Sequence, residues 1–252
     1  LAHFILVKKL EKGELTPRHV LAETYVTTSL IGDIARRFGI TVIDDLPVGF
    51  KFIGEVIEKL RDKNDFVFGV EQSLGYLVGT FVRDKDAAIA ALLLAELVSE
   101  CKDQGRTLID YLDEIYLNYG YYKNNLRMVE CPGKIGFQNI RAIMLGLRQH
   151  PPMELGGVKI LKVIDRLPEA GMTAENYKPG AANDQLTFIF SEDEKTRVTI
   201  RPSGTEPKIK FYAQDRGVVA EDLEKTRASV DDRASGLLEA VVAYGDQFVR
   251  LD

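Results

Sequence analysis

The sequence predicts an α/β protein: an α/β/α layered domain with a mixed, mainly parallel sheet, followed by a smaller α+β domain with an antiparallel sheet. Strand-like and helix-like segments alternate along the first 119 residues with short connections, a pattern typical of parallel sheets. The composition changes at residues 120–133, which we interpret as a hinge or boundary. Beyond it, several strand-like segments precede a closing helix. We therefore expect domains at residues 1–122 and 123–252.

The elements of the first domain follow from the spacing of apolar residues. The strongest helical pattern covers residues 84–104, where Asp84 or Asp86 can cap the first turn. In chain order we expect a helix at 1–10, a strand at 19–25, a helix at 28–38, a strand at 40–43, a helix at 50–60, a strand at 66–71, and helices at 84–104 and 107–119.

The second domain shows the alternation of half-buried strands. A helix is expected first, at residues 136–148, and the turn Pro151-Pro152 follows it. The remaining elements are expected to be strands at 159–165, 186–190, 197–200 and 208–214, and a long helix at 219–244.

Composition excludes several classes of protein. The chain has 252 residues, 45% hydrophobic and 28% charged, which is the balance of a globular protein with its own core. Its net charge of -5 argues against binding to nucleic acid or to anionic membranes. Cys101 and Cys131 are too few for a disulfide framework, and no signal peptide is visible. We expect a cytoplasmic protein whose partner is a small molecule.

The connection between the last two predicted strands concentrates groups that bind anions. Arg201 offers a planar fork of donors, Ser203 and Thr205 offer hydroxyls, and Gly204 allows backbone N–H groups to turn inward. Lys208 adds a positive charge. A polar hairpin turn would have a similar composition, but the density of donors favours a phosphate site.

The same residues carry a resemblance to a known family. The string Arg-Pro-Ser-Gly-Thr-Glu-Pro-Lys, from Arg201 to Lys208, closely resembles the phosphate-binding loop of the α-D-phosphohexomutases, the phosphoglucomutase and phosphomannomutase family. In that family the loop grips the phosphate that is not being transferred. The resemblance implies that Arg201, Ser203, Gly204 and Thr205 are phosphate ligands, assisted by Lys208, in a last domain with a TBP-like fold.

A second segment resembles the sugar-recognition loop of this family, a Glu-x-Ser core near glycine. Glu71 can accept hydrogen bonds from two adjacent sugar hydroxyls, and Ser73 can donate or accept. An exposed turn would explain the pair equally simply. Gln72 stands where a second glutamate is frequent in the family, which affects the fine specificity.

Three basic residues lie in further segments with a family resemblance. Arg83 and Lys85 belong to an Arg-Asp-Lys-Asp segment that opens a helix, a position that favours anions. Lys51 lies in a Gly-Phe-Lys segment, where Val48 replaces the usual threonine. All three are possible active-site residues, and all three could equally be surface side chains.

The family's catalytic phosphoserine loop and its Asp-x-Asp-x-Asp magnesium loop have no counterpart in this sequence. We therefore expect neither a catalytic residue nor a metal ligand here. Because Leu1 already lies in a helical pattern, we expect the chain to be the third and fourth domains of a longer enzyme. The missing N-terminal domains would bind Mg²⁺, and hexose 1,6-bisphosphate would serve as intermediate and activator.

The resemblance implies that the whole protein interconverts hexose 1-phosphate and hexose 6-phosphate and that this chain alone is inactive. Among the family, bacterial phosphoglucomutases and their phosphopentomutase relatives look most similar. Two alternatives stay open: a natural phosphosugar-binding module without chemistry, and a purely structural role for the glycine-rich loops.

Overall fold

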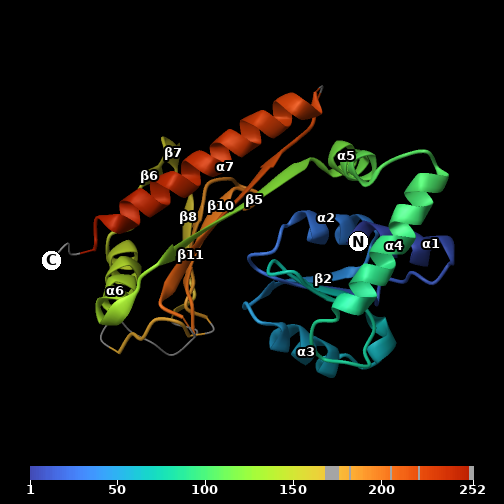
Figure 1. Cartoon of the computed structure of the whole chain (residues 1–252), viewed down its shortest axis with the longest axis horizontal. Coiled ribbons are helices and arrows are strands. Elements are labelled where there is room, and N and C mark those ends of the chain that lie inside the picture. The colour runs from blue at the N-terminus through green and yellow to red at the C-terminus, as the bar shows by residue number, and fades with distance from the viewer. Residues whose placement is uncertain (168–175, 182, 205, 221, 250–252) are drawn as a thin grey trace. The chain divides into compact units, whose positions relative to one another are not determined.

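The computed structural model describes residues 1–167, 176–181, 183–204, 206–220 and 222–249. These residues form two compact units. The N-terminal unit is Leu1–Gly120 with Val218–Leu223, and the C-terminal unit is Tyr121–Gly217 with Glu224–Asp252 (Figure 1). Each unit has its own sheet and its own hydrophobic core.

The N-terminal unit contains a four-stranded sheet with the strand order β2-β1-β3-β4. Strand β1 (Val20–Thr24) pairs in parallel with β2 (Thr41–Leu46) and with β3 (Phe66–Glu71). Strand β4 (Gly75–Leu77) is antiparallel to β3. The prediction of a mixed, mainly parallel sheet is therefore confirmed, although β4 was not expected.

Helices cover both faces of this sheet. The helices are α1 (Ala2–Glu11), α2 (Leu30–Arg37), α3 (Phe50–Lys59), α4 (Ala87–Asp103) and α5 (Leu108–Tyr119), with a 3₁₀ turn, η1 (Lys63–Asp65). Figure 1 shows α3 on one side of the sheet and α2 on the other. On the α3 side, Ile53 and Ile57 pack against Val20 and Ala22 of β1.

Capping residues determine where α4 and α5 begin. Asp86 accepts a hydrogen bond from the N–H of Ile89, so it is the cap of α4, as one of our two alternatives predicted. Thr107 and Asp110 form a reciprocal capping box at the start of α5. Both helices therefore begin within three residues of the predicted positions.

The C-terminal unit contains a five-stranded antiparallel sheet with the order β5-β11-β10-β9-β8, confirming the predicted antiparallel domain. Helices α6 (Gly133–Gln149) and α7 (Leu223–Asp246) pack on it, and their buried side chains share one core with those of the strands. The strands are β5 (Tyr121–Glu130), β8 (Lys162–Asp165), β9 (Leu186–Ile189), β10 (Arg197–Pro202) and β11 (Lys208–Gly217).

Two expectations for the second domain need correction. The division between the two units falls at Gly120 and Tyr121, at the start of the expected boundary stretch 120–133, but the rest of that stretch is not an irregular connection: it contains the ten-residue strand β5, which pairs with β11 along its whole length, and the start of α6. The Lys-Asn-Asn run obscured the strand signal of Tyr121 and Tyr122, both of which are buried. The single strand expected at 159–165 is divided, because β7 (Val158–Lys159) forms a short hairpin with β6 (Glu154–Leu155) before β8 begins.

In the part of the chain that the structure describes, no helix has both the length and the apolar character needed to cross a bilayer.

Candidate functional site

Strands β10 and β11 form a hairpin, and we call its turn together with the flanking strand residues the 201–208 loop. Arg201 and Pro202 lie opposite Lys210 and Ile209, so the strands stay paired up to the loop. The N–H of Ser203 donates to the carbonyl of Lys208 at 2.8 Å, and the Ser203 hydroxyl accepts from the N–H of Glu206 at 3.3 Å. Thr205, one of the predicted phosphate ligands, lies outside the described residues.

The guanidinium group of Arg201 has one donor atom for which the described residues offer no partner. Its Nε atom is buried, and it has no hydrogen-bond partner among the described residues. A buried donor without a partner costs roughly 1–3 kcal/mol. Arg106, Arg148 and Arg216 also have such an atom, so what distinguishes Arg201 is its place at the end of β10, beside the turn that carries Ser203 and Gly204. Lys208 differs, because its ammonium group pairs with Glu206 at 2.5 Å within the same loop.

A cavity of about 220 Å³ lies beside this loop, lined by Glu130, Pro132, Glu206, Pro207 and Lys208. Two carboxylates against one ammonium group make this cavity a poor anion site. The loop offers a better position for a phosphate at Arg201. Gly204 is required for close packing, because a Cβ atom there would lie 2.7 Å from the carbonyl oxygen of Gly180.

The second group of candidates lies in the N-terminal unit, where β3 ends and turns into β4. Glu71 is the last residue of β3 and is only 6% exposed, whereas Ser73 is exposed in the turn. The ammonium group of Lys85 donates to Oε1 of Glu71 at 3.2 Å. A Cβ atom on Gly75 would lie 2.5 Å from Cγ of Glu71, so only glycine leaves room for this pair.

The other two basic candidates do not join this pair. Arg83 donates to Oε1 of Glu58 on α3 at 2.5 Å and to the carbonyls of Thr80 and Val82. That hydrogen bond and the charge of Arg83 lower the pKa of the Glu58 carboxyl. Lys51 is exposed in the first turn of α3, with its ammonium group 4.9 Å from the centre of the Phe52 ring.

Helix α3 nevertheless brings one neighbour of Lys51 to the Glu71 site. The ammonium group of Lys85 lies 5.7 Å from the centre of the Phe50 ring, at the first position of α3. Within the N-terminal unit, the end of β3, the segment before α4 and the start of α3 therefore meet around one buried carboxylate.

The acidic residues near this site do not fit a magnesium centre. Asp86 caps α4, and Asp84 accepts from the N–H of Lys85 at 2.7 Å. No group of three His, Cys, Asp or Glu side chains that could hold a metal occurs among the described residues. Magnesium prefers a compact octahedral set of oxygen ligands, and the described residues near Glu71 do not offer such a set.

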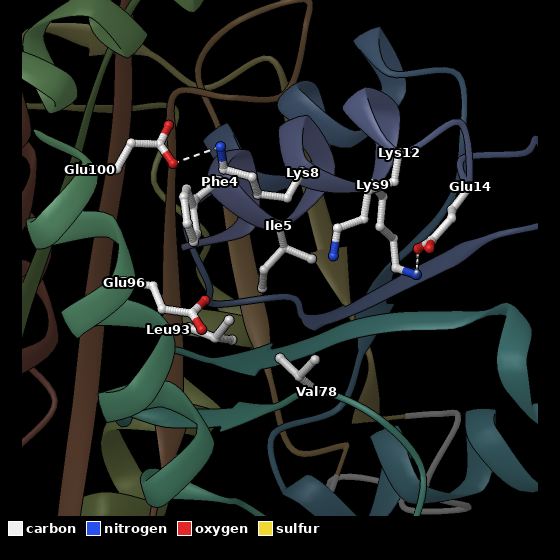
Figure 2. A pocket seen from close by; sticks show the side chains of 10 residues that line it. All are labelled: Phe4, Ile5, Lys8, Lys9, Lys12, Glu14, Val78, Leu93, Glu96 and Glu100. Atoms are coloured by element: carbon white, nitrogen blue, oxygen red, sulfur yellow. Dashed lines mark ion pairs between the residues drawn. The ribbon is translucent and has the colours of Figure 1, made fainter. Parts of the chain in front are cut away.

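A cavity lined by several lysines in the N-terminal unit contains none of the candidate residues. Its volume is about 410 Å³, and Figure 2 shows on its wall Lys8 and Lys9 of α1, Lys12 directly after that helix, and Glu96 and Glu100 of α4. Lys8 pairs with Glu100 at 2.6 Å, and Lys9 pairs with Glu14 at 3.8 Å. Because its charges largely neutralise one another, this cavity is not an anion site.

The histidines make packing contacts and local hydrogen bonds. His3 lies 2.6 Å from the Tyr111 hydroxyl through Nδ1, and its burial lowers its pKa. His19 bonds to Thr16, and His150 stacks on Phe248.

Sequence reasoning found both loops but missed the contacts that hold them. The pairing of Lys85 with Glu71 was not predicted, although both residues had been singled out. A buried cluster behind the 201–208 loop, centred on Asp184, was missed entirely because no motif marks it.

Comparison with known proteins agrees with this architecture. Residues 2–119 match the family model described as phosphoglucomutase/phosphomannomutase, alpha/beta/alpha domain III. A Haemophilus influenzae protein named "Probable phosphomannomutase" is 35% identical over 228 residues, which cover 90% of this chain and 42% of that relative. A phosphoglucomutase of Staphylococcus haemolyticus is 34% identical over 210 residues, covering 82% of this chain and 38% of the relative.

A solved structure supports the fold. The open form of the phosphoglucomutase pp63/parafusin from Paramecium superposes with a TM-score of 0.64 at 16% identity, covering 100% of this chain and 42% of that one. The sequence matches define a class: residues 2–119 match domain III of the phosphoglucomutase/phosphomannomutase family, and the chain is similar to curated phosphosugar mutases over 82–90% of its length. It spans about two fifths of the length of the curated relatives it matches.

Proposed function

We propose that this chain is the substrate-holding part of a phosphosugar mutase that interconverts hexose 1-phosphate and hexose 6-phosphate through a bisphosphate intermediate. The observation that carries the proposal is the buried Nε of Arg201, which has no partner among the described residues and lies at the start of the 201–208 loop. A phosphate oxygen would satisfy this donor, and a guanidinium group binds phosphate with matched planar geometry.

The roles divide between the two units. In the C-terminal unit, Arg201, Ser203, Gly204 and Thr205 bind the phosphate that is not transferred, and Lys208 adds charge once it is released from Glu206.

In the N-terminal unit, Glu71 and Ser73 bind the sugar hydroxyls. The pairing of Lys85 with Glu71 supports a charged carboxylate in this position, ready to accept hydrogen bonds. Lys51 and Arg83 remain candidates for contact with the phosphorylated groups.

The chemical step would need groups that other parts of the enzyme supply. A phosphoserine and Mg²⁺ held outside this chain would transfer the phosphate, and hexose 1,6-bisphosphate would reorient between two half-reactions. Positioning by this chain contributes to catalysis only when the reacting groups are present. We therefore expect this chain alone to bind phosphosugars without converting them.

The test is a binding measurement on Arg201→Ala. Glucose 6-phosphate titrated into the chain by calorimetry should bind the variant at least about tenfold more weakly, because a charge-assisted contact contributes roughly 1.5–3 kcal/mol. Arg127→Ala is the matched control, since it removes an exposed arginine from strand β5 of the same unit. Equal binding by the wild type and Arg201→Ala would overturn the proposed function.

The sugar preference has a separate test in the full-length enzyme. The relatives named above carry both phosphoglucomutase and phosphomannomutase names, and the sequence also resembles phosphopentomutases. Turnover of glucose 1-phosphate, mannose 1-phosphate and ribose 1-phosphate would be compared. A clear preference for ribose 1-phosphate would replace the hexose assignment by a phosphopentomutase.

A further inference from the structure

The backbone of the 201–208 loop rests directly on another segment of the C-terminal unit. Gly180 has a positive φ of 96°, and a Cβ atom there would lie 2.7 Å from both the Cα of Gly204 and the carbonyl oxygen of Ser203. From the other side, a Cβ atom on Gly204 would lie 2.7 Å from the Gly180 carbonyl. Only two glycines can pass this closely, so the position of Gly180 determines where Ser203 and Gly204 can lie.

Gly180 is itself held by a carboxylate that has no contact with solvent. Its N–H donates to Oδ2 of Asp184 at 3.0 Å, and the hydroxyl of Tyr177 donates to the same oxygen at 2.7 Å. Asp184 is 0% exposed. The other oxygen, Oδ1, accepts from Nη2 of Arg148 at 2.7 Å.

Arg148 ties this cluster to the regular elements of the unit. It lies in the last turn of α6, is almost fully buried, and also donates through Nε to both oxygens of Asp165 at 3.1 Å. Burial alone would lower its pKa, but the hydrogen bond to Asp184 and the charges of Asp184 and Asp165 raise it. Burial and the charge of Asp184 raise the pKa of Tyr177, so its hydroxyl stays protonated and donates.

A buried ionic cluster of this kind is a weak source of stability, because desolvation of the charges offsets most of their attraction. The cluster instead fixes a direction: Asp184 accepts from two donors of one segment, Tyr177 and Gly180, and from Arg148 on α6, so it holds that segment against the helix. We propose that Asp184 is a positioning residue that fixes the backbone of Ser203 and Gly204, through Gly180, in the conformation that binds phosphate. This inference rests on the proposed function of the 201–208 loop.

The test compares two buried carboxylates of the C-terminal unit. Asp184→Asn keeps the side-chain shape but directs an amide N–H₂ toward a donor. Asp215→Asn is the matched control, because Asp215 is also buried and bound by Arg233, yet it lies near the end of β11 that is remote from the 201–208 loop. Both variants should lose stability, but only Asp184→Asn should weaken phosphate binding.

The readouts are the dissociation constants of glucose 6-phosphate and of inorganic phosphate, with the amide resonances of Ser203 and Gly204 in two-dimensional NMR spectra. We expect Asp184→Asn to weaken binding about tenfold and to shift both resonances, and Asp215→Asn to change neither. If Asp184→Asn fails to fold, Tyr177→Phe removes one donor to the same oxygen and should produce the same changes to a smaller extent.

The outcomes separate the two proposals. If Arg201→Ala abolishes binding while Asp184→Asn binds like the wild type with unshifted resonances, the positioning role is wrong and the proposed function stands. Equal effects of Asp184→Asn and Asp215→Asn would also overturn it, because they would reflect stability alone. If the wild type binds neither probe, the proposed function itself fails.

Discussion

At the scale of single residues, the pairing of Glu71 and Lys85 is asymmetric. Glu71 is buried, whereas the side chain of Lys85 is 47% exposed. The lysine therefore forms the solvent-facing side of this pair, and the carboxylate forms its buried side. The exposed partner also limits how much the ion pair contributes to stability, because water screens it.

Replacing this lysine tests that contribution. Lys85→Met should lower the free energy of unfolding by about 0.5–1 kcal/mol, since Glu71 keeps its burial and loses its donor. The control is Lys51→Met, which removes an exposed lysine that makes no ion pair with the described residues. Urea unfolding of both variants measures the difference, and equal effects would contradict the role assigned to Lys85.

At the scale of elements, the start of α4 is the clearest case of local control by the sequence. Asp84 and Asp86 are two residues apart, yet only Asp86 reaches a helical N–H, that of Ile89. Asp84 instead binds the N–H of its neighbour, Lys85, which helps to hold Lys85 beside the Glu71 site.

Asp86→Ala should therefore destabilise the chain by about 1 kcal/mol, the usual effect of losing an N-cap. Asp84→Ala should have a smaller effect, because its side chain is mostly exposed and makes no helix cap. Thermal unfolding followed by circular dichroism compares the two, and the reverse order would show that Asp84 is the true cap.

At the scale of the whole molecule, the two units have separate cores, and pH acts on the N-terminal unit through His3. This side chain contacts three rings from two helical segments: Phe38 at the end of α2, and Tyr111 and Tyr119 of α5. Its burial opposes protonation and lowers its pKa below the ordinary histidine value of about 6.5.

The sign of the pH effect follows from this shift. Below pH 6.5 the unfolded chain takes up a proton that the folded chain does not, so stability falls as the pH drops through this range. His3→Gln can still bond to Tyr111 and does not titrate. The free energy of unfolding is measured at pH 7.5 and at pH 5.5. Its decrease between these two values should be smaller for His3→Gln than for the wild type. An identical pH dependence would contradict the assignment.

Much of the fold was predictable because its signals are local. The caps Asp86 and Thr107, the period of α4 and the apolar runs of β1 and β3 each determine an element without help from distant residues. Strand β5 was missed because its second half is exposed, so its sequence lacks the alternation that marks a half-buried strand. Its pairing depends on β11, far along the chain.

In the candidate site, too, only the features with a local sequence signal were predictable. Both loops have short, recognisable strings, so their positions could be predicted. The supports behind them could not, because Arg148, Asp165, Tyr177 and Asp184 come together only in the folded C-terminal unit. Pairing of Lys85 with Glu71 likewise depends on how tightly the chain turns at Gly75.

The long ladder between β5 and β11 also has a consequence for synthesis on the ribosome. All ten residues of β5 pair with β11, whose first residue is Lys208, so the nascent chain carries β5 without its partner while the intervening segments emerge. During that interval Tyr121 and Tyr122, which are buried in the finished fold, are open to water and to other chains. The unpaired β5 is therefore the segment that a chaperone would have to protect. A product truncated before β11 would expose the same strand and would be prone to aggregate.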